Sequence, residues 1–102
     1  MSPKLKEAIA AHQDQIIEDL SSLVAFPSLA FDGYDPQPNL DCAKLVKVLA
    51  EKAGFSQVEL LNIGSDFPVV WAEHFVSHNA PTVLLYGHYD VQPAPEQVQN
   101  WE

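Results

Sequence analysis

The sequence contains no arginine, and its only cationic side chains are five lysines set against 14 aspartates and glutamates. The formal net charge is therefore −9 at pH 7. Arginine is the side chain that grips phosphate through two parallel hydrogen bonds, and nucleic-acid-binding proteins carry a basic patch or stripe. Because this chain lacks both features, we do not expect it to bind DNA or RNA.

Cysteine and long apolar runs are also scarce. Cys42 is the single cysteine, which excludes a disulfide framework within the chain. No apolar run approaches the roughly 18 residues that a membrane-spanning helix needs, and the first residues lack the apolar centre of a signal peptide. These absences predict an acidic, cytoplasmic protein with no membrane partner. Its 102 residues, 47% of them hydrophobic, suit one globular domain or a piece of a larger one.

Helical periodicity dominates the N-terminal part of the sequence. Apolar residues recur at helical spacing from Leu5 to Val24, behind a serine and a proline that are typical of a helix start. The residue before a proline avoids helical dihedral angles, so Pro27 should end this element. The pattern predicts one helix over residues 3–25.

A second helix is predicted after a loop over residues 28–38, which is dense in turn-forming residues. Asn39 is the expected N-cap, and the apolar stripe that follows it runs to Ala53. Gly54 comes directly after that stripe and is the expected stop signal.

Beyond Gly54 the periodicity changes from helical to extended. Strands are predicted over residues 58–61, 67–73 and 82–86. The last of these, Thr-Val-Leu-Leu-Tyr, is apolar throughout, so we expect it to be buried on both faces. Two N-terminal helices followed by strands of a layered sheet indicate an α/β fold, with residues 1–102 forming an incomplete part of one domain.

The segment after the third predicted strand carries the most suggestive chemistry. Successive side chains of an extended chain alternate, so His88 and Asp90 share a face, roughly 6.6 Å apart along the backbone. A metal-binding histidine usually donates its second ring N–H to a carboxylate or carbonyl, which fixes the tautomer. A polar loop that caps a strand end explains the same triplet, and on the triplet alone this plainer interpretation is favoured.

The whole string over residues 83–93 shifts that balance. It resembles the first metal-binding motif of the zinc metallopeptidase family that contains carnosine dipeptidases, cytosolic nonspecific dipeptidase, aminoacylase and succinyl-diaminopimelate desuccinylase. The Asp-Val-Gln-Pro ending, with Trp101 some ten residues later, is most similar to the dipeptidase branch. The resemblance implies that His88 is a zinc ligand and that Asp90 is the catalytic-site acid that orients it, rather than the general base.

The same resemblance implies a two-zinc hydrolase that cleaves the amide bond of dipeptides or N-acyl amino acids, and that could form a homodimer in its full-length form. A catalytic zinc has about three protein ligands, and the motif supplies one. We therefore expect residues 1–102 to be the N-terminal part of a metallopeptidase catalytic domain, without its dimerisation domain and inactive by itself. The alternative is a non-catalytic remnant or interaction module.

Other chemically suggestive residues have simpler explanations. His74 and His78 are expected to be exposed at a strand end and in a loop, and His12 on a helix surface. Cys42 lies on the apolar stripe of the second helix, which favours a buried packing role over a nucleophilic one. The two carboxylates of residues 32–35 could bind a cation weakly, but turn chemistry accounts for them.

Overall fold

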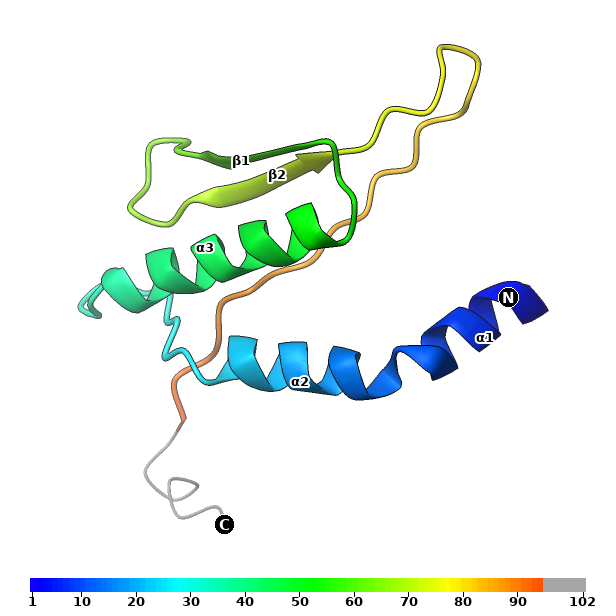
Figure 1. Cartoon of the computed structure of the whole chain (residues 1–102). Coiled ribbons are helices and arrows are strands. Elements are labelled where there is room, and N and C mark those ends of the chain that lie inside the picture. Colours follow the sequence, from blue (N-terminus) through cyan, green and yellow to red (C-terminus); the bar gives the residue numbers. More distant parts are fainter. Residues whose placement is uncertain (95–102) are drawn as a thin grey trace.

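The computed structural model describes residues 1–94, which form three helices and one two-stranded antiparallel sheet (Figure 1). The elements follow in the order α1 (Pro3–Ala11), α2 (Gln13–Val24), α3 (Gln37–Lys52), β1 (Gln57–Leu61) and β2 (Val69–Glu73). Both predicted helical regions and the first two predicted strands are present. The structure is therefore a mixture of helices and strands, as the sequence pattern predicted.

The predicted N-terminal helix is broken at His12. Its start is as expected, because the Ser2 hydroxyl accepts a hydrogen bond from the Leu5 amide at 3.2 Å. At His12 the backbone leaves the helical region, with φ −110° and ψ 11°, and the ring Nδ1 lies 2.8 Å from the Ala8 carbonyl oxygen. That oxygen is also the acceptor for the His12 backbone amide. A side chain that enters the hydrogen-bond ladder in this way bends a helix, so the prediction of one continuous helix was wrong here.

The apolar stripe of α1 and α2 is largely uncovered. Ile9, Ile16, Leu20 and Val24 are all exposed, and neither helix has a buried residue. The α2 helix packs against α3, whereas α1 projects away from the rest of the molecule (Figure 1). The amphipathic sequence therefore forms helices whose apolar side chains remain largely exposed to solvent.

The α3 helix begins two residues before its predicted N-cap. The helix begins at Gln37, whose amide donates a hydrogen bond to the Asp35 carboxylate at 3.0 Å. Asn39 is 1% exposed, and its Nδ2 donates to the Ser28 carbonyl oxygen at 3.2 Å. The prediction of Asn39 as the cap was wrong because this side chain binds the preceding loop instead. The helix stops beside Gly54, whose φ of 101° is the left-handed conformation expected there.

The β1 and β2 strands form an antiparallel hairpin in which Glu59 pairs with Trp71. Gly64 lies in the connecting turn with φ 89°, and its amide donates to the Asn62 side chain at 3.0 Å. The α3 helix packs against both strands. This helix-on-hairpin unit confirms the strands predicted on either side of a turn.

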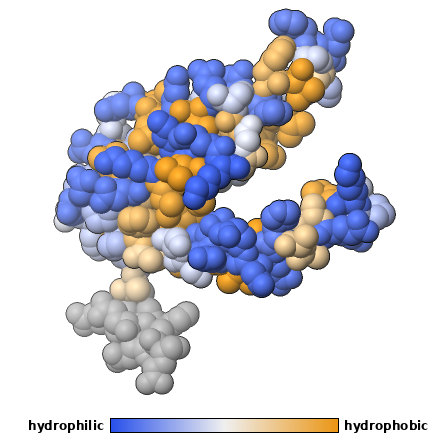
Figure 2. Space-filling model, viewed as in Figure 1, coloured by the Kyte–Doolittle hydropathy of each residue, from blue (hydrophilic) through white to orange (hydrophobic). Residues whose placement is uncertain are grey.

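The third predicted strand does not form. Residues 82–86 are extended but belong to no strand, and Leu84 is 82% exposed. In Figure 1 they lie on the return of the long excursion that follows β2, and Figure 2 shows hydrophobic surface on this projecting arm. A strand buried on both faces needs neighbours that accept its backbone hydrogen bonds, and no strand within residues 1–94 pairs with it. The predicted layered sheet is therefore reduced to a hairpin in this part of the chain.

The fully buried core is small and partly polar. Among the described residues it consists of Ser28, Asn39, Cys42 and Ala43, which lie where α3 meets the loop after α2 and the segment around residue 90. None of the helices within residues 1–94 is both long and apolar enough to cross a bilayer.

Candidate functional site

His88 and Asp90 lie in direct contact on the extended segment that returns toward the core. The His88 Nδ1 atom is 3.0 Å from the Asp90 carboxylate and 3.1 Å from the Asp90 carbonyl oxygen. The Asp90 carbonyl oxygen and the ionised Asp90 carboxylate can only accept hydrogen bonds, so Nδ1 carries the ring proton. The lone pair then resides on Nε2, the nitrogen that a metal ion would bind. The structure thus brings together the two residues that the motif singled out.

The two side chains differ in their access to solvent. The His88 side chain is 73% exposed, whereas that of Asp90 is 31% exposed. The imidazole therefore projects outward from a carboxylate held against the body of the chain. This arrangement leaves the ring open to a metal ion or to further protein groups while one of its nitrogens is already engaged.

The backbone on both sides of Asp90 is anchored to the loop after α2. The Val91 amide donates to the Ser28 carbonyl oxygen at 3.0 Å, and Leu29 and Val91 form a parallel β-bridge. The Ser28 hydroxyl donates to the Tyr89 carbonyl oxygen at 3.1 Å. These contacts join residues about 60 positions apart in the sequence. The family resemblance includes Pro27-Ser28 as a Pro-Ser element, but sequence reasoning assigned Ser28 no functional role and did not predict its contact with the segment around Asp90.

Tyr89 faces inward, opposite to its two neighbours, as alternation along an extended chain predicts. Its phenolic hydroxyl donates to the Pro68 carbonyl oxygen at the start of the hairpin's second strand. Burial raises the pKa of Tyr89 above its ordinary value, and the nearby Cys42 and Asp90 add to the increase. The side chain is therefore a neutral tether between the motif and the β1–β2 hairpin.

Cys42 is fully buried, as predicted from its position on the apolar stripe. Its Sγ atom lies 3.8 Å from the carbonyl oxygens of both Leu23 and Tyr89. Burial raises the pKa of the thiol, and a hydrogen bond with Ser28 offsets only part of that increase. Since the thiolate is the reactive form, this environment suits packing rather than nucleophilic attack.

The remaining histidines lie away from the His88–Asp90 pair. His74 and His78 are exposed as predicted, and the His78 ring packs edge-on against Phe75 with centroids 5.1 Å apart. His12 is exposed at the junction of α1 and α2. Within residues 1–94, no three histidine, cysteine, aspartate or glutamate side chains gather where they could hold a metal ion. In that range His88 is thus a single candidate ligand with its acidic partner.

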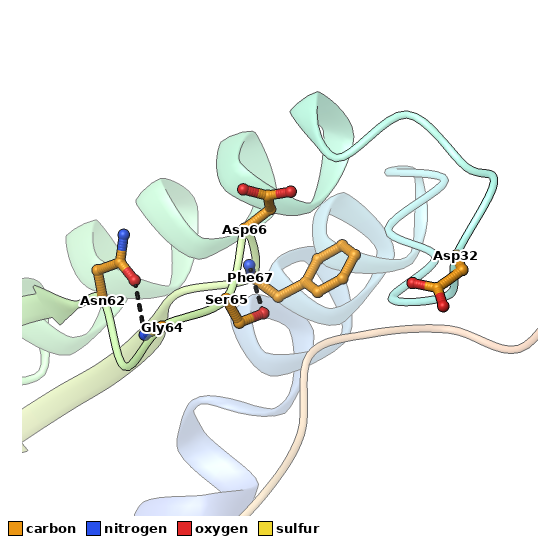
Figure 3. Close-up of a pocket in the computed structure, with 6 residues that line it drawn as sticks. All are labelled: Asp32, Asn62, Gly64, Ser65, Asp66 and Phe67. Atoms are coloured by element: carbon orange, nitrogen blue, oxygen red, sulfur yellow. Dashed lines mark hydrogen bonds between the residues drawn. The ribbon is translucent and has the colours of Figure 1, made fainter.

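The carboxylates of residues 32–35 are separated by the turn that contains them. Asp35 accepts a hydrogen bond from the Gln37 amide at the start of α3, whereas Asp32 lines a shallow pocket of about 430 Å³ together with the β1–β2 turn (Figure 3). Asp66 also lines this pocket, but Figure 3 shows its carboxylate pointing away from Asp32. Turn chemistry accounts for these side chains, in agreement with the sequence analysis. Trp101, part of the family resemblance, lies outside the described residues.

No family model matches the chain, and no solved structure matches it. Three curated proteins are similar to it. The Beta-Ala-His dipeptidases of Rattus norvegicus and Mus musculus are 30% and 34% identical to it over 92% and 89% of this chain, respectively. The Cys-Gly metallodipeptidase DUG1 of Saccharomyces cerevisiae is 26% identical over 86% of this chain.

In each case the match spans 21% of the relative's own length, so the chain corresponds to about a fifth of these enzymes. The likeness extends over most of the present sequence and is therefore not confined to the short motif around His88. The chain is a distant homologue of these three dipeptidases, over a stretch equal to about a fifth of their length.

Proposed function

We propose that this chain supplies one metal ligand, together with the carboxylate that orients it, to the active site of a metal-dependent dipeptidase. His88 binds the metal through Nε2, and Asp90 holds the ring through Nδ1. The observation that carries the proposal is the 3.0 Å contact between Nδ1 and the Asp90 carboxylate. The similarity to metallodipeptidases of mammals and yeast supports it.

The imidazole Nε2 of His88 is a donor atom that suits zinc. Zinc in proteins is bound by neutral imidazole, and the carboxylate contact sets the tautomer that leaves Nε2 available. When bound in a complete site, zinc polarises the scissile carbonyl and lowers the pKa of a water molecule. The general base and the remaining ligands would come from beyond residues 1–94, because His88 is the single ligand candidate there. We therefore expect no dipeptide hydrolysis by the 102-residue chain alone.

The substrate class follows from the relatives. Their names specify Beta-Ala-His and Cys-Gly, which are both dipeptides. We propose dipeptides as the substrates of the complete enzyme, ahead of N-acyl amino acids. The reaction is hydrolysis of the amide bond between the two residues.

A zinc titration of the 102-residue chain, followed by NMR of its histidine rings, tests the ligand assignment. Zinc should perturb His88 weakly, because a single imidazole binds poorly without further ligands. His88→Gln should abolish the perturbation, whereas the matched variant His78→Gln, at another exposed histidine, should leave it unchanged. Perturbation of His74 and His78 in preference to His88 would contradict the assignment, and tight stoichiometric binding would refute the claim that one ligand is too few.

A non-catalytic interaction module is the second candidate, and the exposed apolar segment favours it. Val83, Leu84, Leu85 and Tyr86 are each 77% exposed or more, whereas the two strands within residues 1–94, β1 and β2, are paired with each other. Unpaired apolar strands are templates for association. Association without any zinc effect at His88 would favour this second function over the first.

A further inference from the structure

We propose that Ser28 is a positioning residue for the metal-ligand pair. It fixes the backbone on both sides of Asp90, and through that backbone it places the carboxylate that orients His88. The inference deepens the proposed function and rests on it for the role of His88. The clamp itself is a property of the chain that exists with or without a metal.

The clamp consists of two hydrogen bonds that bracket one residue. The Ser28 hydroxyl donates to the carbonyl oxygen of Tyr89 at 3.1 Å, and the Ser28 carbonyl oxygen accepts from the amide of Val91 at 3.0 Å. Asp90 is the residue between these two anchors. With both neighbouring peptide groups fixed, the Cα–Cβ direction of Asp90 is fixed as well, so its carboxylate has few positions available.

Ser28 is itself held firmly enough to serve as an anchor. It is 0% exposed, and its carbonyl oxygen accepts a second hydrogen bond from the side-chain Nδ2 of Asn39 at 3.2 Å. Asn39 is on α3, the helix that packs against the hairpin. The clamp thus connects the metal-ligand pair to α3 and, through this helix, to the β1–β2 hairpin. This connection also explains why a buried asparagine takes the place at which a helix cap was predicted.

The ligand has little other support among the described residues. The His88 ring is 73% exposed, and the residues that precede it along the chain, 81–87, are all exposed. Its recorded hydrogen bonds go to the side chain and the carbonyl oxygen of Asp90. The orientation of the ring therefore depends on Asp90, and that of Asp90 on the backbone that Ser28 holds.

Two other contacts with Tyr89 do not replace the clamp. The Tyr89 hydroxyl donates a hydrogen bond to the Pro68 carbonyl oxygen. This bond restrains the far end of the tyrosine side chain rather than the peptide group beside Asp90. The Cys42 thiol lies 3.8 Å from the Tyr89 carbonyl oxygen, and a thiol is a weak donor. Loss of the Ser28 hydroxyl would leave that carbonyl oxygen with the thiol alone.

The tautomer of the neutral His88 ring reports on the clamp directly. In the full chain labelled with ¹⁵N-histidine, and without metal, the wild-type protein should hold the His88 proton mainly on Nδ1. Ser28→Ala should shift a large part of the population to the Nε2–H form. The matched variant Ser22→Ala, which also removes a serine-to-backbone hydrogen bond but lies on the surface of α2, should leave the ring unchanged. An unchanged tautomer in Ser28→Ala would overturn the proposal.

A second readout uses the wild-type chain, because Ser28→Ala could also unfold the core. The Val91 amide, which Ser28 engages, should exchange with solvent roughly tenfold more slowly than the amide of the exposed Tyr86. Equal exchange rates would overturn the clamp without any variant. Neither readout needs zinc, so a failure of the clamp is distinct from a failure of His88 to bind metal. If the clamp exists and His88 binds metal, Ser28→Ala should also weaken zinc binding at His88 by about tenfold.

Discussion

At the scale of single residues, the His88–Asp90 contact was predictable, whereas its support was not. Two residues apart on extended chain, the side chains share a face and can reach each other, which is a purely local property. Ser28 contacts Tyr89 across 61 positions of sequence. No local pattern encodes such a contact, since it arises only when α3 brings the loop and the return segment together.

Asp90→Asn is the variant that tests most directly whether the Asp90 carboxylate orients the His88 ring. The amide keeps the size of the carboxylate but lacks its charge and can turn its NH₂ group toward Nδ1, which would favour the wrong tautomer. We expect zinc binding at His88 to weaken by about 10- to 100-fold, measured by the same ring NMR titration. Asp66→Asn, at an exposed carboxylate on the β1–β2 turn, is the matched control and should have no effect. Equal zinc affinity in Asp90→Asn and wild type would remove Asp90 from the site.

The buried thiol gives a prediction on pH. Burial raises the pKa of Cys42 above its ordinary value of 9.0, so the unfolded chain releases this proton at a lower pH than the folded chain does. Above pH 9 the unfolded state therefore binds fewer protons, and stability falls as the pH rises toward the folded-state pKa. Urea unfolding followed by circular dichroism should show this loss.

The variant Cys42→Ala identifies the source of the alkaline loss. It removes the thiol, so the decline that remains should be centred higher, near pH 10, where the half-buried Tyr89 loses its proton in the unfolded state. An identical decline in the variant and in the wild-type chain would contradict the role given to the thiol.

At the scale of elements, periodicity located the helices and the hairpin but could not locate breaks or partners. The break at His12 comes from a ring nitrogen that competes for one helix carbonyl, a detail that a repeating apolar pattern does not contain. Residues 82–86 have the composition of a buried strand, and they remain exposed because no strand within residues 1–94 pairs with them. Composition indicates what an element requires, but the presence of a partner decides whether the element forms.

Gly54 sets the end of α3, and its replacement should be costly. Its φ of 101° is unfavourable for a residue with a Cβ atom, so Gly54→Ala should destabilise the chain by about 1 kcal/mol, measured by urea unfolding. Gly87→Ala is the matched control, because Gly87 has open space around its Cα atom and no positive φ. A larger loss of stability at Gly87 than at Gly54 would contradict this account of the helix end.

The unpaired apolar segment should drive self-association of the 102-residue chain. Sedimentation velocity should show growth in size with protein concentration, and Leu84→Lys should reduce it because Leu84 is 82% exposed and free of folding constraints. Leu20→Lys changes an exposed leucine on α2 instead and should have a smaller effect. A larger reduction of self-association by Leu20→Lys than by Leu84→Lys would indicate that the helices drive the association.

At the scale of the whole molecule, a net charge of −9 accompanies a very small buried core. Within residues 1–94, Ser28, Asn39, Cys42 and Ala43 are the residues that are fully buried, so hydrophobic burial in this part of the chain contributes little to stability. Like charges repel in the folded chain, and salt screens this repulsion. We expect a broad thermal transition by circular dichroism that moves to higher temperature as sodium chloride is added. A sharp transition at high temperature, independent of salt, would contradict this description.

The chain matches about a fifth of the length of its dipeptidase relatives, and this proportion agrees with the single candidate ligand in its described part. The family was predictable from residues 83–93, because they combine the histidine, the acidic partner and a preceding apolar run. The complete metal site was not, because within residues 1–94 no three histidine, cysteine, aspartate or glutamate side chains gather where they could hold a metal ion. The proposed function is therefore best tested in the context of a full-length relative.

The most direct test places this sequence in that context. Residues 1–102 would replace the matching stretch of the Rattus norvegicus Beta-Ala-His dipeptidase, with hydrolysis of Beta-Ala-His as the readout. We predict that the chimaera hydrolyses the dipeptide, that His88→Gln abolishes this activity, and that His78→Gln preserves it. A folded chimaera whose activity survives His88→Gln would contradict the assignment of His88 as a metal ligand.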